Sequence, residues 1–521
     1  MLVGTKRAAH HGHSTAPPTT FPATIVERSD SSGNGISKRT AWLTLSVVCL
    51  SSVLMGLQTS ALNVALPKVV SDLDASPVEA NWILLSSMLT MTSLVIVFGR
   101  LADMFGRKSM YMGGLALFSI ASLFAGFSAD VWVLITWRIV QAVGGAMLIT
   151  NSAAILTDVF PRRSLGPGMG IYAASFAVAQ LVGPSLGGLI TTSIGWSWVF
   201  WINAPIGLLC LIWGMMVMPH LPHHGRGQRI DFLGNVLLLI MLSSLLVALT
   251  QLSELGWSNP VVVAGFALFV LVLPSFVLFE LRQPSPVLDV RMFRRLSFSA
   301  PMGATFLNAV SHIAVVVLMS LYLQTVLGRS AAQAGVQLLP LAIAAVVAST
   351  SSGFLMRWVN PRYLAASGSG FAAAGLGVLI LAIHTNGTYL FLSCGLVLIG
   401  YGAGTFLPSN TVALIQNLSS DRVGLVNSVR LMIQSTGAVI STSVALTILT
   451  ASLPRADRQL AFVGDLTDAP AGTRGALIDG YIVALTCMAV LATLAAVCSM
   501  VGGRAERRSS VPAVCQTPES L

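Results

Sequence analysis

Charged side chains are scarce in this chain, and their scarcity excludes an ordinary soluble protein. Only 9% of the 521 residues are Asp, Glu, Lys or Arg, whereas 55% are hydrophobic. A soluble domain has about a quarter charged residues, and its surface helices keep a polar face. The stretch 261–279 has no polar face at all. The composition therefore predicts an integral membrane protein whose surface is in contact with the lipid bilayer.

Several kinds of chemical site are also missing. The six cysteines are scattered and show neither a disulfide framework nor a zinc-ligand spacing. The sequence has no Walker-type Gly-Lys-Ser/Thr motif and no clustered Ser, His and Asp. The glycines of 400–404 lie in an apolar stretch, without the strand that precedes a nucleotide loop. We therefore expect no enzyme activity, no cofactor and no bound metal.

Apolar stretches as long as a bilayer-crossing helix recur along the chain from Ala41 to Gly502. Such a helix needs about 20 apolar residues, and short charged connections separate the stretches. The pattern predicts an all-α, polytopic membrane protein with fourteen transmembrane helices. The expected spans are 42–66, 80–99, 109–128, 131–155, 168–191, 196–218, 232–253, 260–281, 298–326, 333–356, 362–384, 388–413, 424–450 and 479–502.

Basic residues lie on alternate connections, and this asymmetry predicts the orientation of the chain. An even number of spans places both termini on one side. The connections on the other side contain only Lys68, Arg329, Arg455, Arg458 and Arg474, and Lys and Arg favour the cytoplasmic side. We expect a multi-pass cell-membrane protein, in a bacterium the plasma or inner membrane, with cytoplasmic termini. The asymmetry also accounts for the net charge of +10, so nucleic acid is not an expected partner.

Small residues repeat at nearly equal distances and indicate an internal duplication. The pair Gly144-Gly145 recurs as Gly402-Ala403-Gly404, 258 residues later, and Gly99 is matched by Gly353, 254 residues later. Internal duplication is common in transporter folds. We expect a disordered cytoplasmic tail (1–40), an N-terminal six-helix half (41–218), a central helix pair with flanking cytoplasmic loops (219–296), a C-terminal six-helix half (297–503) and a second cytoplasmic tail (504–521).

The segment 99–108, Gly-Arg-Leu-Ala-Asp-Met-Phe-Gly-Arg-Lys, is the most informative connection. Gly99 and Gly106 would let the chain turn tightly at the membrane face. Asp103 would interact with Arg107 or with a helix N-terminus, with Asp158 close to the same cluster. An ordinary cytoplasmic loop would explain the basic residues but not the acid or the glycine spacing. We therefore expect a charge lock that stabilises one access state.

This segment resembles the signature loop of the major facilitator superfamily. Helix 131–155 adds Trp-Arg-Ile-Val-Gln with Arg138 and Gln141, which is similar to the family's buried-arginine motif. The fourteen spans resemble the drug:proton antiporter branch of the EmrB/QacA type. The resemblance covers 42–502 and implies a major-facilitator-like fold, transport of a small-molecule substrate and protons as the coupling ion.

The sequence Gly-Pro-Ser-Leu-Gly-Gly, with Gly183, Pro184, Gly187 and Gly188, resembles the family's antiporter motif, which is associated with exporters. The proline removes one helical hydrogen bond, and the next two glycines remove side-chain bulk. The resemblance implies packing against the partner half that keeps the transporter from leaking. Simple helix crossing is the alternative interpretation.

Two arginines lie inside expected spans, where a charge is costly and is functional by default. Arg138 must face the bundle interior with polar partners, and a structural arginine satisfied by helix carbonyls is the alternative. Arg430 lies on helix 424–450, with Asn427 and Gln434 at helical spacing on the same side. We expect both arginines to act as buried charges in coupling, with Gln141 beside Arg138.

The proton-coupling acid typical of the branch is replaced here. The branch commonly has Leu-Asp before Asn-Val-Ala-Leu-Pro, whereas this chain has Leu-Gln, with Gln58 in the acidic position and Asn63 in the run that follows. Candidates for the substrate cavity are Gln58, Asn63, His312, Asn427 and Gln434, although His312 is equally well explained as a packing residue. Coupling would then use Asp103, Asp158, His312 or a proton carried by the substrate.

These features favour a secondary active transporter that exports drugs or other hydrophobic and amphiphilic compounds. Two buried arginines without a deep carboxylate suit neutral or anionic substrates better than cations. One alternative is export or import of a single metabolite, lipid or siderophore. Another is a membrane sensor or assembly partner that does not transport.

Overall fold

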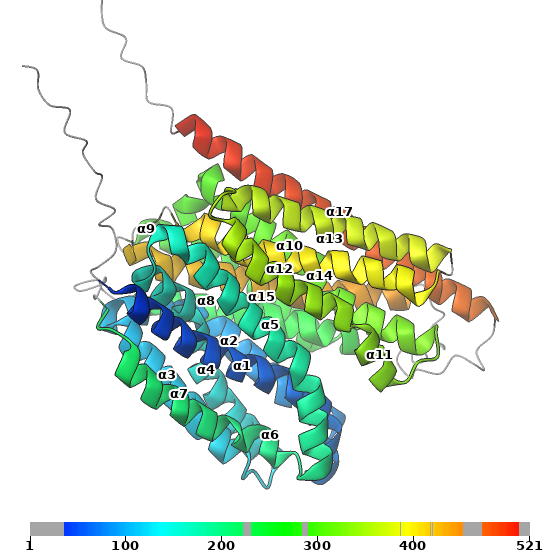
Figure 1. Ribbon diagram of the computed structural model, residues 1–521. Coiled ribbons are helices and arrows are strands. Elements are labelled where there is room, and N and C mark those ends of the chain that lie inside the picture. Colours follow the sequence, from blue (N-terminus) through cyan, green and yellow to red (C-terminus); the bar gives the residue numbers. More distant parts are fainter. Residues whose placement is uncertain are drawn as a thin grey trace, which may run out of the picture.

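The computed structural model describes residues 36–221, 231–283, 290–385, 387–416, 418, 420–451 and 471–509. This part of the chain is almost entirely helical (Figure 1). Its elements are α1 (Lys38–Asp72), α2 (Pro77–Phe105), α3 (Arg107–Ala125), α4 (Val131–Val159), α5 (Arg162–Ser193), α6 (Ser197–Trp201), α7 (Asn203–Val217), α8 (Phe232–Leu255), α9 (Pro260–Arg282), the 3-10 helix η1 (Val290–Arg294), α10 (Leu296–Thr325), α11 (Ala331–Gln337), α12 (Leu339–Leu355), α13 (Pro361–His384), α14 (Tyr389–Ile415), α15 (Ser420–Ala451) and α17 (Ala471–Ser509).

The helices confirm the expected all-α membrane architecture. Within the described residues, 13 helical segments are long and apolar enough to cross a bilayer, and α8 adds a shorter apolar helix, Leu233–Leu249. Two expected spans are each divided into two helices. The break between α6 and α7 precedes Pro205, and the break between α11 and α12 precedes Pro340. Each proline lacks the N–H that would continue the helical hydrogen bonds.

The two six-helix halves repeat the same packing. An added Cβ on Gly144 of α4 would lie 2.8 Å from the carbonyl oxygen of Gly114 on α3. In the second half, a Cβ on Gly402 of α14 would lie 2.5 Å from the carbonyl oxygen of Gly368 on α13. Both sites bring helix backbones close together, as small residues do in membrane proteins. Figure 1 shows α1 to α7 on one side of the bundle and α10 to α17 on the other.

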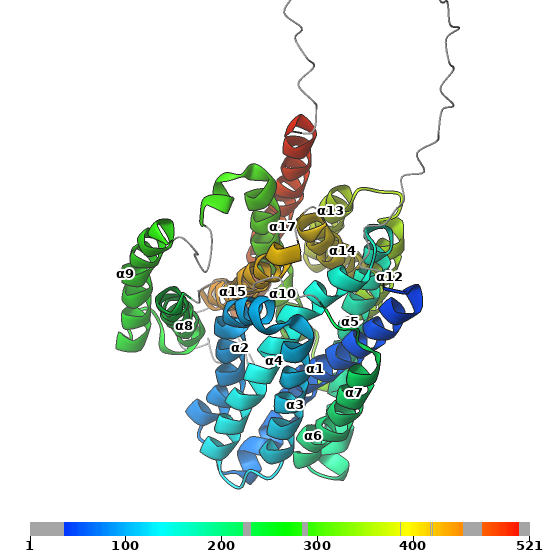
Figure 2. The same cartoon turned by 90° about the vertical axis from the view of Figure 1, so that its left-hand side faces the viewer.

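The helix pair α8 and α9 is central in the sequence but peripheral in the molecule (Figure 2). α8 packs against α2 and α15, and α9 packs outside α8. Ser243 of α8 lies 3.1 Å from Ser93 of α2, and Ser443 of α15 donates a hydrogen bond of 2.9 Å to the carbonyl of Leu249. The pair therefore covers a seam between the two halves.

A cluster of charges attaches this pair to the first half. Arg100 of α2 interacts electrostatically with Glu280 of α9 and with Asp231, which caps the N-terminus of α8. Glu280 is 3% exposed. A Cβ on Gly234 would lie 2.7 Å from a carboxylate oxygen of each acid, so both acids lie against the first turn of α8.

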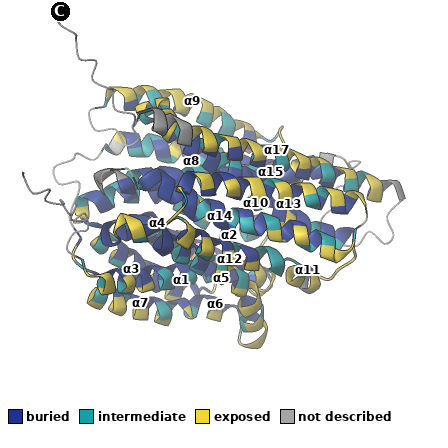
Figure 3. Cartoon of the chain, turned by 45° about the horizontal axis from the view of Figure 1, so that its top comes forward, coloured by how far each residue is buried: buried dark blue, intermediate teal, exposed yellow. Residues whose placement is uncertain are grey.

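Exposed residues lie on the outer faces of the helices (Figure 3). Many of them are large and apolar, as expected for a surface in lipid. The polar side chains buried inside the bundle are hydrogen-bonded to neighbouring helices in many cases, for example Asn203, Asn410 and Ser441. The expected tails lie mainly outside the described residues, at 1–35 and 510–521, as do 222–230 and 284–289 beside the helix pair. Helices extend into both expected tails, because α1 begins at Lys38 and α17 ends at Ser509.

Candidate functional site

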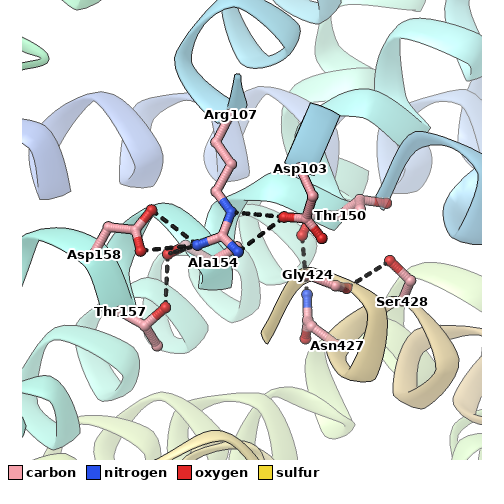
Figure 4. Close-up of polar contacts among 9 residues, drawn as sticks. All are labelled: Asp103, Arg107, Thr150, Ala154, Thr157, Asp158, Gly424, Asn427 and Ser428. Carbon is pink, nitrogen blue, oxygen red and sulfur yellow. Dashed lines mark hydrogen bonds and ion pairs between the residues drawn. The ribbon is translucent and has the colours of Figure 1, made fainter. Parts of the chain in front are cut away.

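The guanidinium of Arg107 lies between two carboxylates, and we call Asp103, Arg107 and Asp158 the gate cluster (Figure 4). Arg107 Nε and Nη2 donate to Asp103 Oδ1 at 3.1 and 2.9 Å. Nη1 lies 2.8 Å from both carboxylate oxygens of Asp158. The Arg107 side chain is 1% exposed. A buried arginine with two carboxylates forms strong charge-assisted hydrogen bonds of defined geometry.

The local backbone explains why Asp103 and Arg107 meet. α2 continues to Phe105, and only Gly106 separates it from α3. Gly106 has a φ of 98°, a value that glycine adopts without steric cost. The expected loop is therefore a single-residue turn, with Asp103 and Arg107 on its two sides. We call this side of the bundle the Gly106 end.

Gly99 does not form a turn, because it lies inside α2. A Cβ on Gly99 would overlap the hydroxyl of Ser428 on α15. Gly424, one turn before Ser428, faces the gate cluster, and its Cβ would lie 2.8 Å from Asp103 Oδ1. Asn427 donates to the carbonyl of Thr150 on α4 at 3.1 Å. The gate cluster of the first half is thus in direct contact with the first turns of α15 in the second half.

A second contact between the halves joins α5 and α12 at the same end. A Cβ on Gly166 would lie 2.9 Å from the carbonyl oxygen of Gly353, and a Cβ on Gly170 would lie 2.5 Å from the carbonyl oxygen of Ser349. All the described glycines that make such close contacts across the two halves lie at the Gly106 end. Backbone contacts this close leave no room for a side chain or a solute between the helices.

A central cavity of about 120 Å³ lies further along the same helices. Its walls come from α5, α10, α12, α14 and α15, so both halves contribute. Ala173 and Phe176 line it, three and six residues beyond Gly170, which is about 5 to 9 Å along the helix. The cavity is therefore separated from the Gly106 end by the contacts just described.

Arg430 is a charged residue in the wall of this cavity, and it is 6% exposed. Its Nε and Nη2 each lie 3.2 Å from Asn427 Oδ1, and Nη1 donates to Gln434 Oε1 at 2.9 Å. Arg430, Gln434 and His312 line the cavity, whereas Asn427 lies behind Arg430. Amide oxygens therefore orient this arginine without neutralising it.

Arg138 lies in the first half, away from the cavity. It is 7% exposed; Nε donates to the carbonyl of Ile83 on α2 at 3.3 Å, and Nη1 donates to Gln141 Oε1 at 2.8 Å. Gln141 in turn donates to Ser122 of α3 at 2.6 Å. Arg138 thus connects α2, α3 and α4. In the described part of the chain, neither Arg138 nor Arg430 forms an ion pair with a carboxylate within 4.0 Å.

The glycines of the expected antiporter motif pack within one half. A Cβ on Gly183 would overlap the hydroxyl of Ser60, and one on Gly187 would lie 2.6 Å from Ala61 Cα, both on α1. Gly188 has ordinary contact with α1 and Pro184 is exposed. The expected contact with the partner half does not occur here. Gly183 and Gly187 lie four residues apart on one helix face, and in this structure that face is turned to α1.

Three of the five expected cavity residues do not line the cavity: Asn427 lies behind Arg430, and Gln58 and Asn63 lie elsewhere. Gln58 is 3% exposed and its Oε1 accepts a hydrogen bond from Asn203 of α7. Asn63, further along α1, is exposed and does not line the cavity. Sequence analysis also overlooked Gly166, Gly170 and Gly424. The four-residue spacings of Gly166 with Gly170, and of Gly424 with Ser428, were usable signals for close helix contact.

Comparisons with known proteins agree with this architecture. The family model for the Major Facilitator Superfamily matches residues 48–442. The uncharacterized transporter YebQ of Escherichia coli (strain K12) is 31% identical over 382 residues, which cover 73% of this chain and 83% of that protein. The tetracenomycin C resistance and export protein of Streptomyces glaucescens is 26% identical over 510 residues, 92% of this chain and 95% of that protein.

Solved structures show the same fold. The human organic anion transporter MFSD10 (TETRAN) superposes with a TM-score of 0.60 at 15% identity, covering 87% of this chain and 99% of that one. The proton:xylose symporter XylE gives a TM-score of 0.58 at 15% identity, covering 88% and 95%. The family model extends over most of the sequence. The chain therefore belongs to the Major Facilitator Superfamily and is a membrane transporter, not an enzyme.

Proposed function

We propose that this protein exports small amphiphilic compounds from the cytoplasm by alternating access, driven by the proton gradient. The observation that carries the proposal is the position of the central cavity. Both halves line it, and the gate cluster and the α5–α12 glycines close it from the Gly106 end. Rocking of two halves about such a midplane site is the usual mechanism of duplicated transporters.

The direction of transport is supported by relatives and by charge. Similar proteins include the multidrug transporter protein MdtP of Bacillus subtilis, 26% identical over 406 residues, and the puromycin resistance protein pur8 of Streptomyces alboniger, 28% identical over 483 residues. Basic residues concentrate on the connections at the Gly106 end, which favours a cytoplasmic position for that end. The structure would then be the state that is closed to the cytoplasm.

Proton coupling is part of the proposal, and Gln58 cannot carry it because an amide does not titrate. Asp103 and Asp158 are available acids, and both interact with Arg107. Protonation of either carboxylate would weaken the gate cluster and so favour its opening. His312 in the cavity wall and a proton on the substrate are the other routes.

Accumulation of puromycin and tetracenomycin C in cells that produce the protein tests the proposal. We expect lower accumulation than in cells without it, and loss of that difference when a protonophore dissipates the gradient. A persistent difference would contradict proton coupling. If each compound accumulates equally in cells with and without the protein, the protein does not export it. Higher accumulation in the producing cells would indicate uptake.

Arg138→Ala should lower transport about tenfold and leave the protein in the membrane. The substitution removes the charged donor that joins Ile83 and Gln141, and a hydrogen bond to a charged group contributes about 1.5–3 kcal/mol. Loss of these bonds would loosen the packing of α2 against α4. The ends of these two helices carry Asp103 and Asp158, so the gate cluster would be less well positioned and transport would fall. Transport per membrane-inserted molecule is the measurement, with Arg329→Gln as a control at an exposed arginine. Normal transport by Arg138→Ala would contradict a functional role.

A further inference from the structure

We propose that the central cavity is a binding site for organic anions, in which Arg430 binds the ionised acid group of an amphiphilic substrate. This inference rests on the proposed transport function and names its substrate class. The apolar part of the substrate would lie against Phe176, Phe406 and Leu407, which line the same cavity.

The charge of the cavity wall favours an anion. Arg430 and His312 are the basic side chains that line it, and none of the described lining residues is Asp or Glu. His312 Nδ1 lies 2.7 Å from the carbonyl oxygen of Asn308. Because a carbonyl oxygen only accepts hydrogen bonds, Nδ1 carries the proton of this contact. A cationic substrate would face positive charge without a carboxylate to compensate it.

Arg430 is also able to bind a ligand while keeping its present contacts. Its hydrogen bonds to Asn427 and Gln434 use three of the five N–H donors of the guanidinium. The two remaining donors match the two oxygens of a carboxylate, which arginine binds through parallel hydrogen bonds. The interactions are strong in a buried site because the effective dielectric constant is low.

The neighbouring polar residues have protein partners. Asn410 donates to Thr305 at 2.8 Å, and Asn308 donates to Ser369 at 3.4 Å. Their amide donors are therefore directed into the second half, toward α10 and α13. Arg430 is left as the residue that distinguishes ligands by charge.

Three naphthalene probes of similar size and different charge test this inference. They are 1-naphthaleneacetate, its neutral amide, and the cation (1-naphthylmethyl)trimethylammonium. Binding to the purified full-length protein in nanodiscs is measured by equilibrium dialysis. We expect the anion to bind about tenfold or more tightly than the amide, because a hydrogen bond between charged groups raises affinity by about that factor. The cation should bind least.

Arg430→Gln should weaken binding of the anion at least about tenfold and abolish the preference over the amide. Arg430→Lys should retain a preference for the anion over the cation, because it keeps the charge. Arg329→Gln removes the same charge from an exposed position and should leave binding of all three probes unchanged. Thermal unfolding and gel filtration establish whether each variant is folded. If Arg430→Gln does not fold, the order of the three probes on the unmodified protein decides the question.

The inference is overturned if naphthaleneacetate does not bind, if the cation binds as tightly as the anion, or if folded Arg430→Gln keeps full affinity for the anion. These outcomes are separate from failure of the proposed function. Anion binding without transport in proteoliposomes would contradict the transport proposal and support the site. Transport with a preference for cations would support the transport proposal and contradict the anion site.

Discussion

Gly170→Val is expected to abolish transport while the protein remains folded in the membrane. A Cβ at this position would lie 2.5 Å from the carbonyl oxygen of Ser349 and 2.9 Å from Gly353 Cα. Both obstacles are backbone atoms of α12, which cannot rotate away as a side chain can. The helices would have to separate, so the Gly106 end could not close. A transporter that cannot close one end cannot complete its cycle.

Labelling can show that the defect lies in closure. Ser349, whose carbonyl forms this contact, is 3% exposed and lines the cavity. We therefore expect Ser349→Cys to be protected from a membrane-impermeant maleimide applied at the Gly106 end. The added Gly170→Val substitution should make it reactive. Gly370→Val and Gly377→Val are matched controls on α13, because a Cβ there meets nothing within 4 Å. Normal transport by Gly170→Val, with Ser349→Cys still protected, would refute this role.

Arg107→Gln should cause the second large loss, in stability as well as transport. It would remove the guanidinium that forms ion pairs with the buried carboxylates of Asp103 and Asp158. Removing one partner from a buried ion pair lowers the free energy of unfolding by about 3–5 kcal/mol. The Asp103 carboxylate that faces Gly424 of α15 would lose its partner on Arg107. Thermal unfolding in detergent and transport in proteoliposomes measure the two effects.

Two comparisons make this prediction specific. Lys68→Gln breaks the ion pair with Asp72 on α1, whose side chains are 55% and 37% exposed. An exposed pair contributes about 0–1 kcal/mol, so this variant should behave like the unmodified protein. Asp103→Asn keeps a hydrogen-bond acceptor for Arg107 and should reduce turnover more than substrate binding. Arg107→Gln with unchanged stability and turnover would show that the gate cluster is not needed.

The sequence predicted the helices well because length and hydropathy determine which segments can cross a bilayer. The contact of Asp103 with Arg107 could also be predicted, since the two residues lie on either side of the glycine that ends α2. Asp158 lies 51 residues beyond Arg107, so no local spacing places it near the pair. The locations of Arg138 and Arg430 inside the bundle followed from the cost of exposing a charge to lipid.

The partners of the glycines could not be predicted in the same way. A Gly spacing indicates that a helix has a face suited to close packing, but it does not say which helix faces it. Gly183 and Gly187 pack on α1 in the same half, whereas Gly166 and Gly170, on the same α5, pack on α12 of the other half. The rotation of α5 between these positions decides the outcome. Gln58 illustrates the same limit, because it was expected in the substrate cavity but is buried against Asn203 of α7.

The position of α8 and α9 has a consequence for any motion of the two halves. α8 contacts α2 and α15, which must move relative to one another when the Gly106 end opens. It cannot travel with both. The charges of Arg100, Glu280 and Asp231 attach the pair to α2. Ser443 of α15 donates a hydrogen bond to the carbonyl of Leu249 on α8. We therefore expect the helix pair to move with the first half and to slide over α15. A fourteen-helix transporter would then move as eight helices against six.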